Sequence, residues 1–156
     1  MTLLKSYYQL CKPNVVYMML ICAFVGMLLA EETVRSFGYL FVALSGIALC
    51  SASAAAINQV IDRNTDASMT RTDQRPLPKG ELSATHASVF AFVIGVIGAL
   101  ILYFYVNTLT MILTIASLIG YAFIYTIYLK RATPQNIVIG GLAGAAPPLL
   151  GWSSIT

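Results

Sequence analysis

The sequence predicts an all-α protein, a polytopic membrane helix bundle. Of its 156 residues 58% are hydrophobic and only 10% carry a charged side chain, against about 25% charged residues in ordinary soluble domains. The apolar residues are also gathered into stretches that approach or exceed the roughly 18–20 residues that a helix needs to span a bilayer. A soluble domain of this length could not bury so much apolar surface, so we expect a single membrane domain over residues 1–156.

About five apolar stretches qualify as spanning helices. Pro13 suits the first turn of the first one, because its missing N–H would have no partner there. Asn107 and Thr108 form a tight turn between the third and fourth spans. Glycines together with Pro147 and Pro148 interrupt the fifth span, so we expect a broken helix there, buried in protein or beside a cavity. The expected spans are 13–30, 37–61, 84–106, 109–129 and 136–155.

The basic residues predict the orientation in the membrane. Eight of the nine Lys and Arg residues fall on one side of the predicted bundle, and only Arg35 falls on the other. The positive-inside rule then places the N-terminus and the loop 62–83 in the cytoplasm, and the C-terminus outside after an odd number of spans. The net charge of +3 reflects this bias and predicts no nucleic-acid partner. Without a cleavable signal or an Arg/Ser-rich presequence, we expect a bacterial cytoplasmic (inner) membrane.

Three polar side chains at the end of the second span predict a metal site. Asn58, Asp62 and Asp66 are spaced i, i+4, i+8, so on a continuous helix they lie on one face along about 12 Å of its axis. Aligned carboxylates repel each other unless a cation lies between them. Hard oxygen ligands suit Mg²⁺, which takes one or two carboxylates and completes its shell with water and phosphate oxygens.

The loop after this helix supplies cations at a steady spacing of four, namely Arg71, Arg75 and Lys79. Guanidinium groups match phosphate oxygens in a bidentate way, and a lysine acts as a point charge. Acidic residues that hold a metal, beside cations that hold phosphate, predict a diphosphate site. A second interpretation stays open, because charges at a helix end are often a solvated cap. The protein would then be a non-catalytic membrane scaffold or transport subunit.

Tyr121, Tyr125 and Tyr128 share one face of the fourth span. They are either an interfacial aromatic belt or a wall that stabilises a carbocation by cation–π attraction, and both interpretations stay open. In the second, Tyr125 contacts the substrate.

The spacing of the polar residues resembles the first aspartate-rich motif of the UbiA superfamily of intramembrane prenyltransferases. The matching run is Asn58-x-x-x-Asp62-x-x-x-Asp66 followed by Met69-x-Arg71-Thr72-x-x-Arg75-Pro76-Leu77-Pro78. Three further stretches narrow the resemblance to the members of the superfamily that act on haem. They are Lys12-Pro13, Tyr125-x-x-Tyr128-Leu129-Lys130-Arg131, and Thr133-Pro134-Gln135-Asn136-Ile137 continuing to Pro147-Pro148-x-x-Gly151-Trp152. The stretch that begins at Thr133 is the most specific of the three.

The resemblance implies a reaction and a cofactor. A farnesyl group would pass from farnesyl diphosphate to a vinyl group of haem b, giving haem O for terminal oxidases. Asn58, Asp62 and Asp66 would bind Mg²⁺ and the diphosphate, with Asp62 and Asp66 as the catalytic pair. The cations that would neutralise the diphosphate are Arg71, Arg75, Lys130 and Arg131.

The resemblance also implies a larger bundle of about nine helices, each long enough to span the bilayer. We therefore expect this chain to be an N-terminal portion that is incomplete for catalysis by itself. The expected partners are farnesyl diphosphate, haem b and the lipid bilayer, with terminal-oxidase assembly proteins as candidates. A related enzyme with an aromatic quinone-precursor acceptor is the alternative within the same superfamily.

Overall fold

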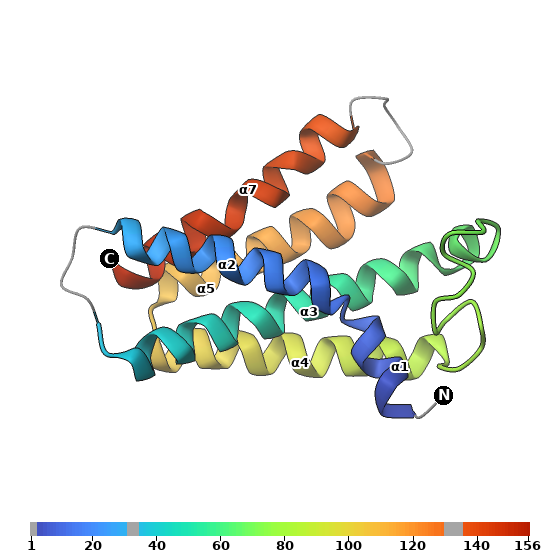
Figure 1. The fold of residues 1–156 in the computed structure, drawn as a ribbon, viewed down its shortest axis with the longest axis horizontal. Helices are drawn as coiled ribbons and strands as arrows, with labels where there is room; N and C mark the ends of the chain where they lie inside the picture. The colour runs from blue at the N-terminus through green and yellow to red at the C-terminus, as the bar shows by residue number, and fades with distance from the viewer. Residues whose placement is uncertain (1–2, 31–34, 130–135) are drawn as a thin grey trace.

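The computed structural model describes residues 3–30, 35–129 and 136–156, apart from the side chains of Ile124 and of residues 127–129 and 136–143. The described chain is helical, which confirms the predicted all-α class (Figure 1). In chain order the elements are α1 (Leu3–Leu10), α2 (Pro13–Leu29), α3 (Phe37–Ala67), α4 (Ala84–Tyr105), α5 (Thr108–Ile119), the π-helix η1 (Gly120–Leu129) and α7 (Asn136–Ile155).

The apolar helices make this an integral membrane protein. α3 and α4 are each long enough to cross a bilayer, and their most apolar windows have mean hydropathies of 2.1 and 2.5. α1 and α2, bent by 46° at their junction, together form a third candidate span. In the expected fourth span the chain changes from an α-helix to a π-helix at Gly120. The predicted turn lies one residue earlier, at Val106 and Asn107, because Thr108 is the first residue of α5 and Asn107 is its N-cap.

The helices lie roughly along one axis (Figure 1). α3 packs along α4, and α2 packs along α7; these are the two most extensive helix contacts. At one end of the bundle lie α1, the C-terminal end of α3 and the loop that joins α3 to α4. α7 and the segment from α5 to η1 lean away from α3 and α4 toward that same end. The chain ends at the opposite end, beside the start of α3.

Small residues bring α3 and α4 close together. A Cβ atom added at Gly98 would lie 2.8 Å from the Sγ atom of Cys50 and 2.9 Å from the carbonyl oxygen of Gly46. Ser53 is buried and donates a hydrogen bond of 2.7 Å to the carbonyl of Ala91. Apolar lipid gives helices little hydrophobic reason to associate, so close backbone contact and interhelical hydrogen bonds stabilise such pairs.

α7 is one helix from Asn136 to Ile155 with Pro147 and Pro148 inside it, so the expected break is wrong. A proline removes one backbone donor, but neighbouring groups in a membrane bundle compensate for such losses. Here α2 packs tightly on the proline pair. A Cβ atom added at Gly26 of α2 would lie 2.0 Å from the Pro148 carbonyl oxygen.

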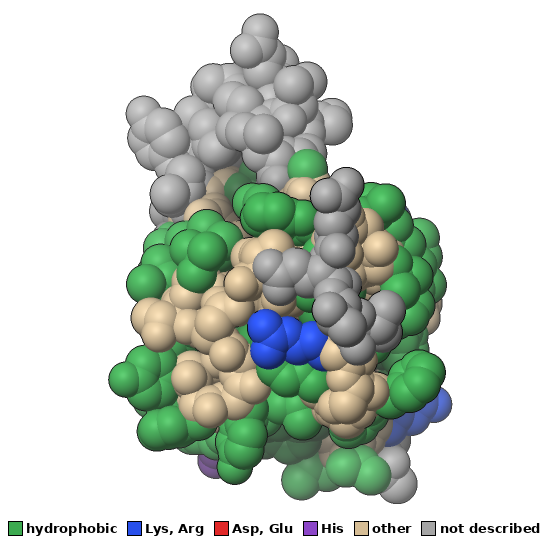
Figure 2. All heavy atoms as spheres, turned by 90° about the vertical axis from the view of Figure 1, so that its left-hand side faces the viewer, with side chains coloured by type: hydrophobic (Ala, Val, Ile, Leu, Met, Phe, Trp, Pro, Cys, Tyr) green, Lys and Arg blue, Asp and Glu red, His purple; other side chains and the backbone are tan. Residues whose placement is uncertain are grey.

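Side chains from other elements cap the last carbonyl groups of α7. Asn107 donates to the Ser153 carbonyl at 2.8 Å, Tyr39 to Ser154 at 2.6 Å, and Arg35 to Ile155 at 3.2 Å. Figure 2 shows this end of the bundle, with a basic group near the centre and hydrophobic side chains mostly around the rim. Since the last four carbonyls of a helix have no partner within it, these bonds tie the end of α7 to α3 and to the α4–α5 turn.

Asn107→Ala is expected to destabilise the protein by about 2 kcal/mol, because it removes a helix cap and an interhelical hydrogen bond, each worth about 1 kcal/mol. The Asn107 side-chain oxygen accepts from the Thr110 amide at 2.7 Å, while its amide group serves α7. Asn107→Asp keeps the acceptor and should lose about half as much. Unfolding by sodium dodecyl sulfate in mixed micelles measures both variants, and equal losses would contradict the double role.

Candidate functional site

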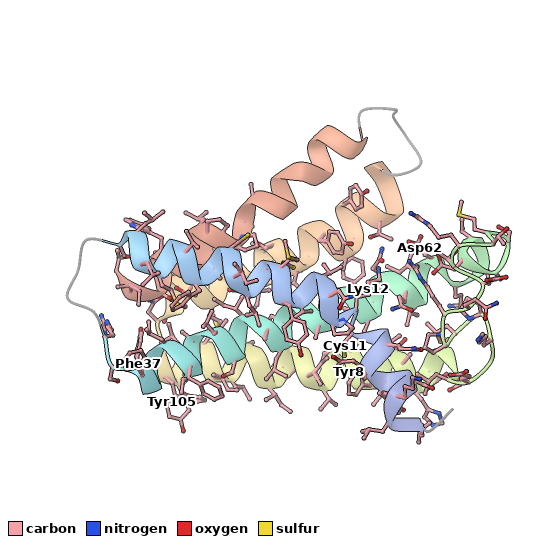
Figure 3. The ribbon with its side chains drawn as sticks, in the orientation of Figure 1. Tyr8, Cys11, Lys12, Phe37, Asp62 and Tyr105 are labelled. Atoms are coloured by element: carbon pink, nitrogen blue, oxygen red, sulfur yellow. The ribbon has the colours of Figure 1, made fainter. Side chains whose placement is uncertain are left out.

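The C-terminal part of α3 carries the predicted polar row. The helix continues beyond Ile61 to Ala67, so Asn58, Asp62 and Asp66 lie on one uninterrupted helix in i, i+4, i+8 register. Their side chains are only 5%, 4% and 4% exposed. Figure 3 places Asp62 near the loop end of the bundle, far from Phe37 at the start of the same helix. The row is therefore a buried polar face and not a solvated cap.

Asn58 is the centre of a hydrogen-bond network that joins three elements. Its amide nitrogen donates to Asp62 Oδ2 at 3.1 Å and to Thr126 Oγ1 of η1 at 3.0 Å. Its amide oxygen accepts from the ammonium group of Lys12. Because an ammonium group only donates and a carboxylate only accepts, these partners fix the orientation of the amide.

Asp66 is paired with Arg75 from the following loop. Arg75 Nη1 lies 2.6 Å from Asp66 Oδ2, and the two side chains are 30% and 6% exposed. The hydroxyl of Thr72, which is buried, donates to the Asp66 carbonyl at 3.0 Å. This bond holds the loop against the end of α3, so that Arg75 lies beside the Asp66 carboxylate.

The other predicted cations are placed differently. Arg71 and Lys79 are exposed on the loop surface. Of the three loop cations, Arg75 is the one that lies against a carboxylate, that of Asp66. Lys130 and Arg131 lie outside the described residues, as does the side chain of Tyr128.

Tyr121 and Tyr125 of η1 are stacked, with ring centroids 5.6 Å apart and planes inclined by 12°. The hydroxyl of Thr126 is fully buried and donates to the Tyr121 carbonyl at 2.9 Å. Since Thr126 also accepts from Asn58, one side chain connects the tyrosine pair to the polar face of α3.

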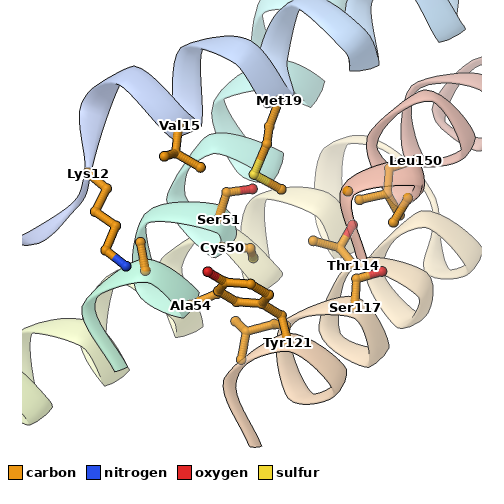
Figure 4. A pocket seen from close by; sticks show the side chains of 14 residues that line it. Lys12, Val15, Met19, Cys50, Ser51, Ala54, Thr114, Ser117, Tyr121 and Leu150 are labelled. Carbon is orange, nitrogen blue, oxygen red and sulfur yellow. The ribbon is translucent and has the colours of Figure 1, made fainter. Parts of the chain in front are cut away.

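An apolar cavity of about 210 Å³ lies beside this network (Figure 4). Residues of α2, α3, α5 and α7 line it, among them Met19, Ala54 and Leu150. Tyr121 forms part of its wall, and the Lys12 side chain reaches it from the start of α2. Lys12 therefore lines the cavity and also bonds to the polar face, so the two regions adjoin at this side chain.

Three residues of this site, Lys12, Thr72 and Thr126, have no role in the sequence prediction, although Lys12 and Thr72 stand in the stretches that carry the resemblance. Thr126 carried a usable signal, because a polar residue within an apolar span is a functional hypothesis by default. Thr72 was visible only as part of a motif. Lys12 stands 46 positions before Asn58, and only the packing of α2 on α3 reveals its role.

The donor set fits Mg²⁺ in part. Asp62 and Asp66 supply the one or two carboxylates that a magnesium ion shared with substrate phosphates takes. The oxygen of Asn58 is already bonded to Lys12, so this amide is arranged to position Asp62 more than to coordinate a metal. Among the described residues no group of three or more His, Cys, Asp or Glu side chains could form an all-protein metal site.

The buried acidic face and the apolar cavity beside it lie inside a bundle of apolar helices, so the chain is an intramembrane helix-bundle protein with a polar site in its interior. The chain belongs to the UbiA prenyltransferase family, whose sequence model matches residues 19–156. No solved structure matches the chain.

The chain is similar to several protohaem IX farnesyltransferases. The chain is 60% identical to protohaem IX farnesyltransferase 2 of Pseudoalteromonas atlantica over 152 residues, covering 97% of this chain and 50% of that protein. It is 59% identical to the protohaem IX farnesyltransferase of Idiomarina loihiensis, of which it covers 51%, and 56% identical to that of Hahella chejuensis, also covered to 51%. The chain thus spans about half the length of the curated relatives it matches.

Proposed function

We propose that this protein transfers a farnesyl group from farnesyl diphosphate to haem b, forming haem O. The observation that carries the proposal is the buried face of Asn58, Asp62 and Asp66 next to an apolar cavity. Its chemistry suits a ligand with an anionic head and a long apolar tail. The 60% identity to a protohaem IX farnesyltransferase supports haem as the acceptor.

The polar face would bind the diphosphate. Asp62 and Asp66 would hold Mg²⁺, which when bound helps neutralise the charge on the departing diphosphate. Asn58 would keep the Asp62 carboxylate oriented through their 3.1 Å hydrogen bond. The cations that would contact the phosphate oxygens are Arg71, Arg75, Lys79, Lys130 and Arg131.

The apolar cavity would bind the farnesyl tail. When the bond between C1 and the diphosphate oxygen breaks, the electron pair stays on the oxygen and an allylic cation remains. The stacked rings of Tyr121 and Tyr125 would stabilise that cation through their π faces, and the apolar wall would keep water away from it. A new C–C bond to the haem vinyl group then moves the positive charge to the porphyrin side, where water adds and loses a proton.

The orientation in the membrane follows from charge. We infer a bacterial cytoplasmic membrane, with the N-terminus and the loop 62–83 on the cytoplasmic side, because the exposed Arg71 and Lys79 lie in that loop and basic loops stay inside. Farnesyl diphosphate would then reach the site from the cytoplasm, and terminal-oxidase assembly proteins are candidate partners.

Farnesyl transfer in membranes tests this proposal. Membranes that contain the protein, expressed from the complete reading frame, are supplied with farnesyl diphosphate, haem b and Mg²⁺, and the pigments are identified by chromatography and mass spectrometry. We expect haem O, and a loss of about 100-fold on chelation with EDTA, because the metal supplies several kcal/mol of charge stabilisation. Excess Mg²⁺ should restore the rate.

Each alternative gives a different result. Prenylation of an aromatic quinone precursor without any reaction of haem would overturn the acceptor. Haem O formation that EDTA leaves unchanged would overturn the role of the metal. Membranes that prenylate neither acceptor would favour a non-catalytic protein.

A further inference from the structure

The junction between α1 and α2 has an unfavourable backbone. α1 ends at Leu10, α2 begins at Pro13, and the two helices are bent by 46°. Lys12 between them has φ 49° and ψ 62°, and it is the one non-glycine residue with positive φ in the described ranges. A side chain in the left-handed region costs roughly 1–2 kcal/mol, and glycine would avoid that cost. Such an outlier suggests a functional side chain.

The Lys12 side chain reaches from this junction to α3. Its ammonium group donates to the Asn58 amide oxygen, and the same side chain lines the apolar cavity (Figures 3 and 4). An ammonium group has three N–H donors, so a contact with Asn58 is compatible with a contact to a ligand oxygen. Lys12 therefore stands at the boundary between the polar face and the cavity.

Gln59 holds the backbone that precedes Lys12. Its side chain is 2% exposed and donates from Nε2 to the carbonyls of Gln9 at 3.1 Å and Leu10 at 3.0 Å. These are carbonyls at the end of α1, and the Gln9 carbonyl also accepts from the backbone N–H of Lys12 at 3.1 Å. Two consecutive residues of α3 thus bind both parts of the junction. Gln59 donates hydrogen bonds to the end of α1, and Asn58 accepts a hydrogen bond from the ammonium group of Lys12.

Because Lys12 lies between the polar face and the apolar cavity, it would contact an amphiphilic ligand where the anionic head joins the apolar tail. This step rests on the proposed function, in which the head is a diphosphate and the tail is a farnesyl chain. A cation between the two binding regions meets the head oxygen nearest the tail, which is the oxygen that keeps the electron pair when the C–O bond breaks. A fixed positive charge there stabilises the transition state more than the bound substrate.

We propose that Lys12 is a diphosphate-binding residue of this site, and that Gln59 is the positioning residue that fixes Lys12 through the end of α1.

Binding of farnesyl diphosphate to Lys12 variants tests the first part. The protein, expressed from the complete reading frame, is placed in lipid nanodiscs with Mg²⁺ and titrated calorimetrically with farnesyl diphosphate, inorganic pyrophosphate and farnesol. Lys12→Met and Lys12→Gly should each weaken binding of both phosphate ligands about tenfold, as expected for a lost charge-assisted hydrogen bond, and leave farnesol binding unchanged. Lys12→Arg should stay within about threefold of wild type, because it keeps the charge.

The glycine variant removes the ammonium group and also relieves the left-handed backbone, so folding strain cannot explain a loss of affinity there. The matched control is Lys5→Met, since Lys5 is exposed on α1, and it should bind like wild type. Wild-type affinity for pyrophosphate and farnesyl diphosphate in both Lys12→Met and Lys12→Gly would overturn the assignment of Lys12.

A double-mutant cycle tests Gln59. Gln59→Met keeps the side-chain volume and loses the two donors. It should weaken farnesyl diphosphate binding about fivefold in the wild-type background and less than about twofold in the Lys12→Met background, because coupled residues are not additive. A residue that only packs would cost the same in both backgrounds, and that result would overturn its positioning role. Gln74→Met, in an exposed loop position, is the matched control.

Asp62→Asn in the same assay separates the two proposals. If wild type and Asp62→Asn bind farnesyl diphosphate equally, and without any effect of Mg²⁺, the proposed function itself fails. If Asp62→Asn loses binding while the Lys12 variants keep it, the proposed function stands and only the role of Lys12 is wrong.

Discussion

Asp62→Asn is expected to lower Mg²⁺-dependent farnesyl transfer by about 100-fold or more, the size of effect seen when one preorganised charge-stabilising group is removed. The substitution keeps the shape of the side chain. An asparagine oxygen at this position still accepts the hydrogen bond that Asn58 donates at 3.1 Å. What is lost is the negative charge that would hold the metal, at a position only 4% exposed.

The fold should not suffer from this change. Asp62→Asn keeps the side-chain volume and the hydrogen bond from Asn58, so the unfolding midpoint should stay close to that of wild type. Haem O formation in membranes measures the rate, and Asp73→Asn, in the loop beyond the polar row, is the matched control that should stay within about twofold. Activity of Asp62→Asn close to wild type would remove Asp62 from the site.

The polar row was predictable because its geometry is local. Residues at i, i+4 and i+8 share a face on any α-helix, so the sequence alone placed Asn58, Asp62 and Asp66 together. It also predicted an all-helical membrane bundle, because hydropathy depends only on composition along the chain. Both expectations needed no knowledge of tertiary contacts.

The loop cations show where the same argument fails. A spacing of four between Arg71, Arg75 and Lys79 has a geometrical meaning only on a helix, and this segment is a series of turns. The hydrogen bond from Thr72 to the end of α3 directs Arg75 toward Asp66. The other two cations remain exposed.

Tertiary packing decided the rest of the site. The contact of Lys12 with Asn58 requires the bend between α1 and α2 and the position of α2 on α3. The contact of Thr126 with Asn58 requires η1 to lie against α3. The double proline of α7 gave a misleading signal for a related reason. Its effect depends on neighbouring helices, here on how closely α2 packs against it.

Gly151→Ala is expected to destabilise the protein by about 3 kcal/mol, at the upper end of overpacking effects. A Cβ atom at this position of α7 would lie 1.8 Å from the carbonyl oxygen of Ala23 in α2. One turn earlier in α7 the glycine is on the other helix. A Cβ atom added at Gly26 of α2 would lie 2.0 Å from the carbonyl oxygen of Pro148 in α7. Backbone meets backbone at both points, so no side chain can move aside and the two helices must separate.

Moving α2 away from α7 should also change the shape of the apolar cavity that would bind the farnesyl chain. α2 and α7 supply facing walls of the cavity, with Val15 and Met19 on one side and Ala146 and Leu150 on the other. We therefore expect Gly151→Ala to weaken farnesyl diphosphate binding in nanodiscs, together with its loss of stability in detergent unfolding.

Gly120→Ala is the matched control. A Cβ atom there meets nothing within 4 Å, and alanine favours a helix over glycine by roughly 0.5–1 kcal/mol, so this variant should be as stable as wild type or slightly more so. Gly151→Ala that unfolds like Gly120→Ala would show that α2 and α7 do not meet through these glycines. Reduced stability with unchanged affinity would instead mean that the cavity between them is not where the farnesyl chain binds.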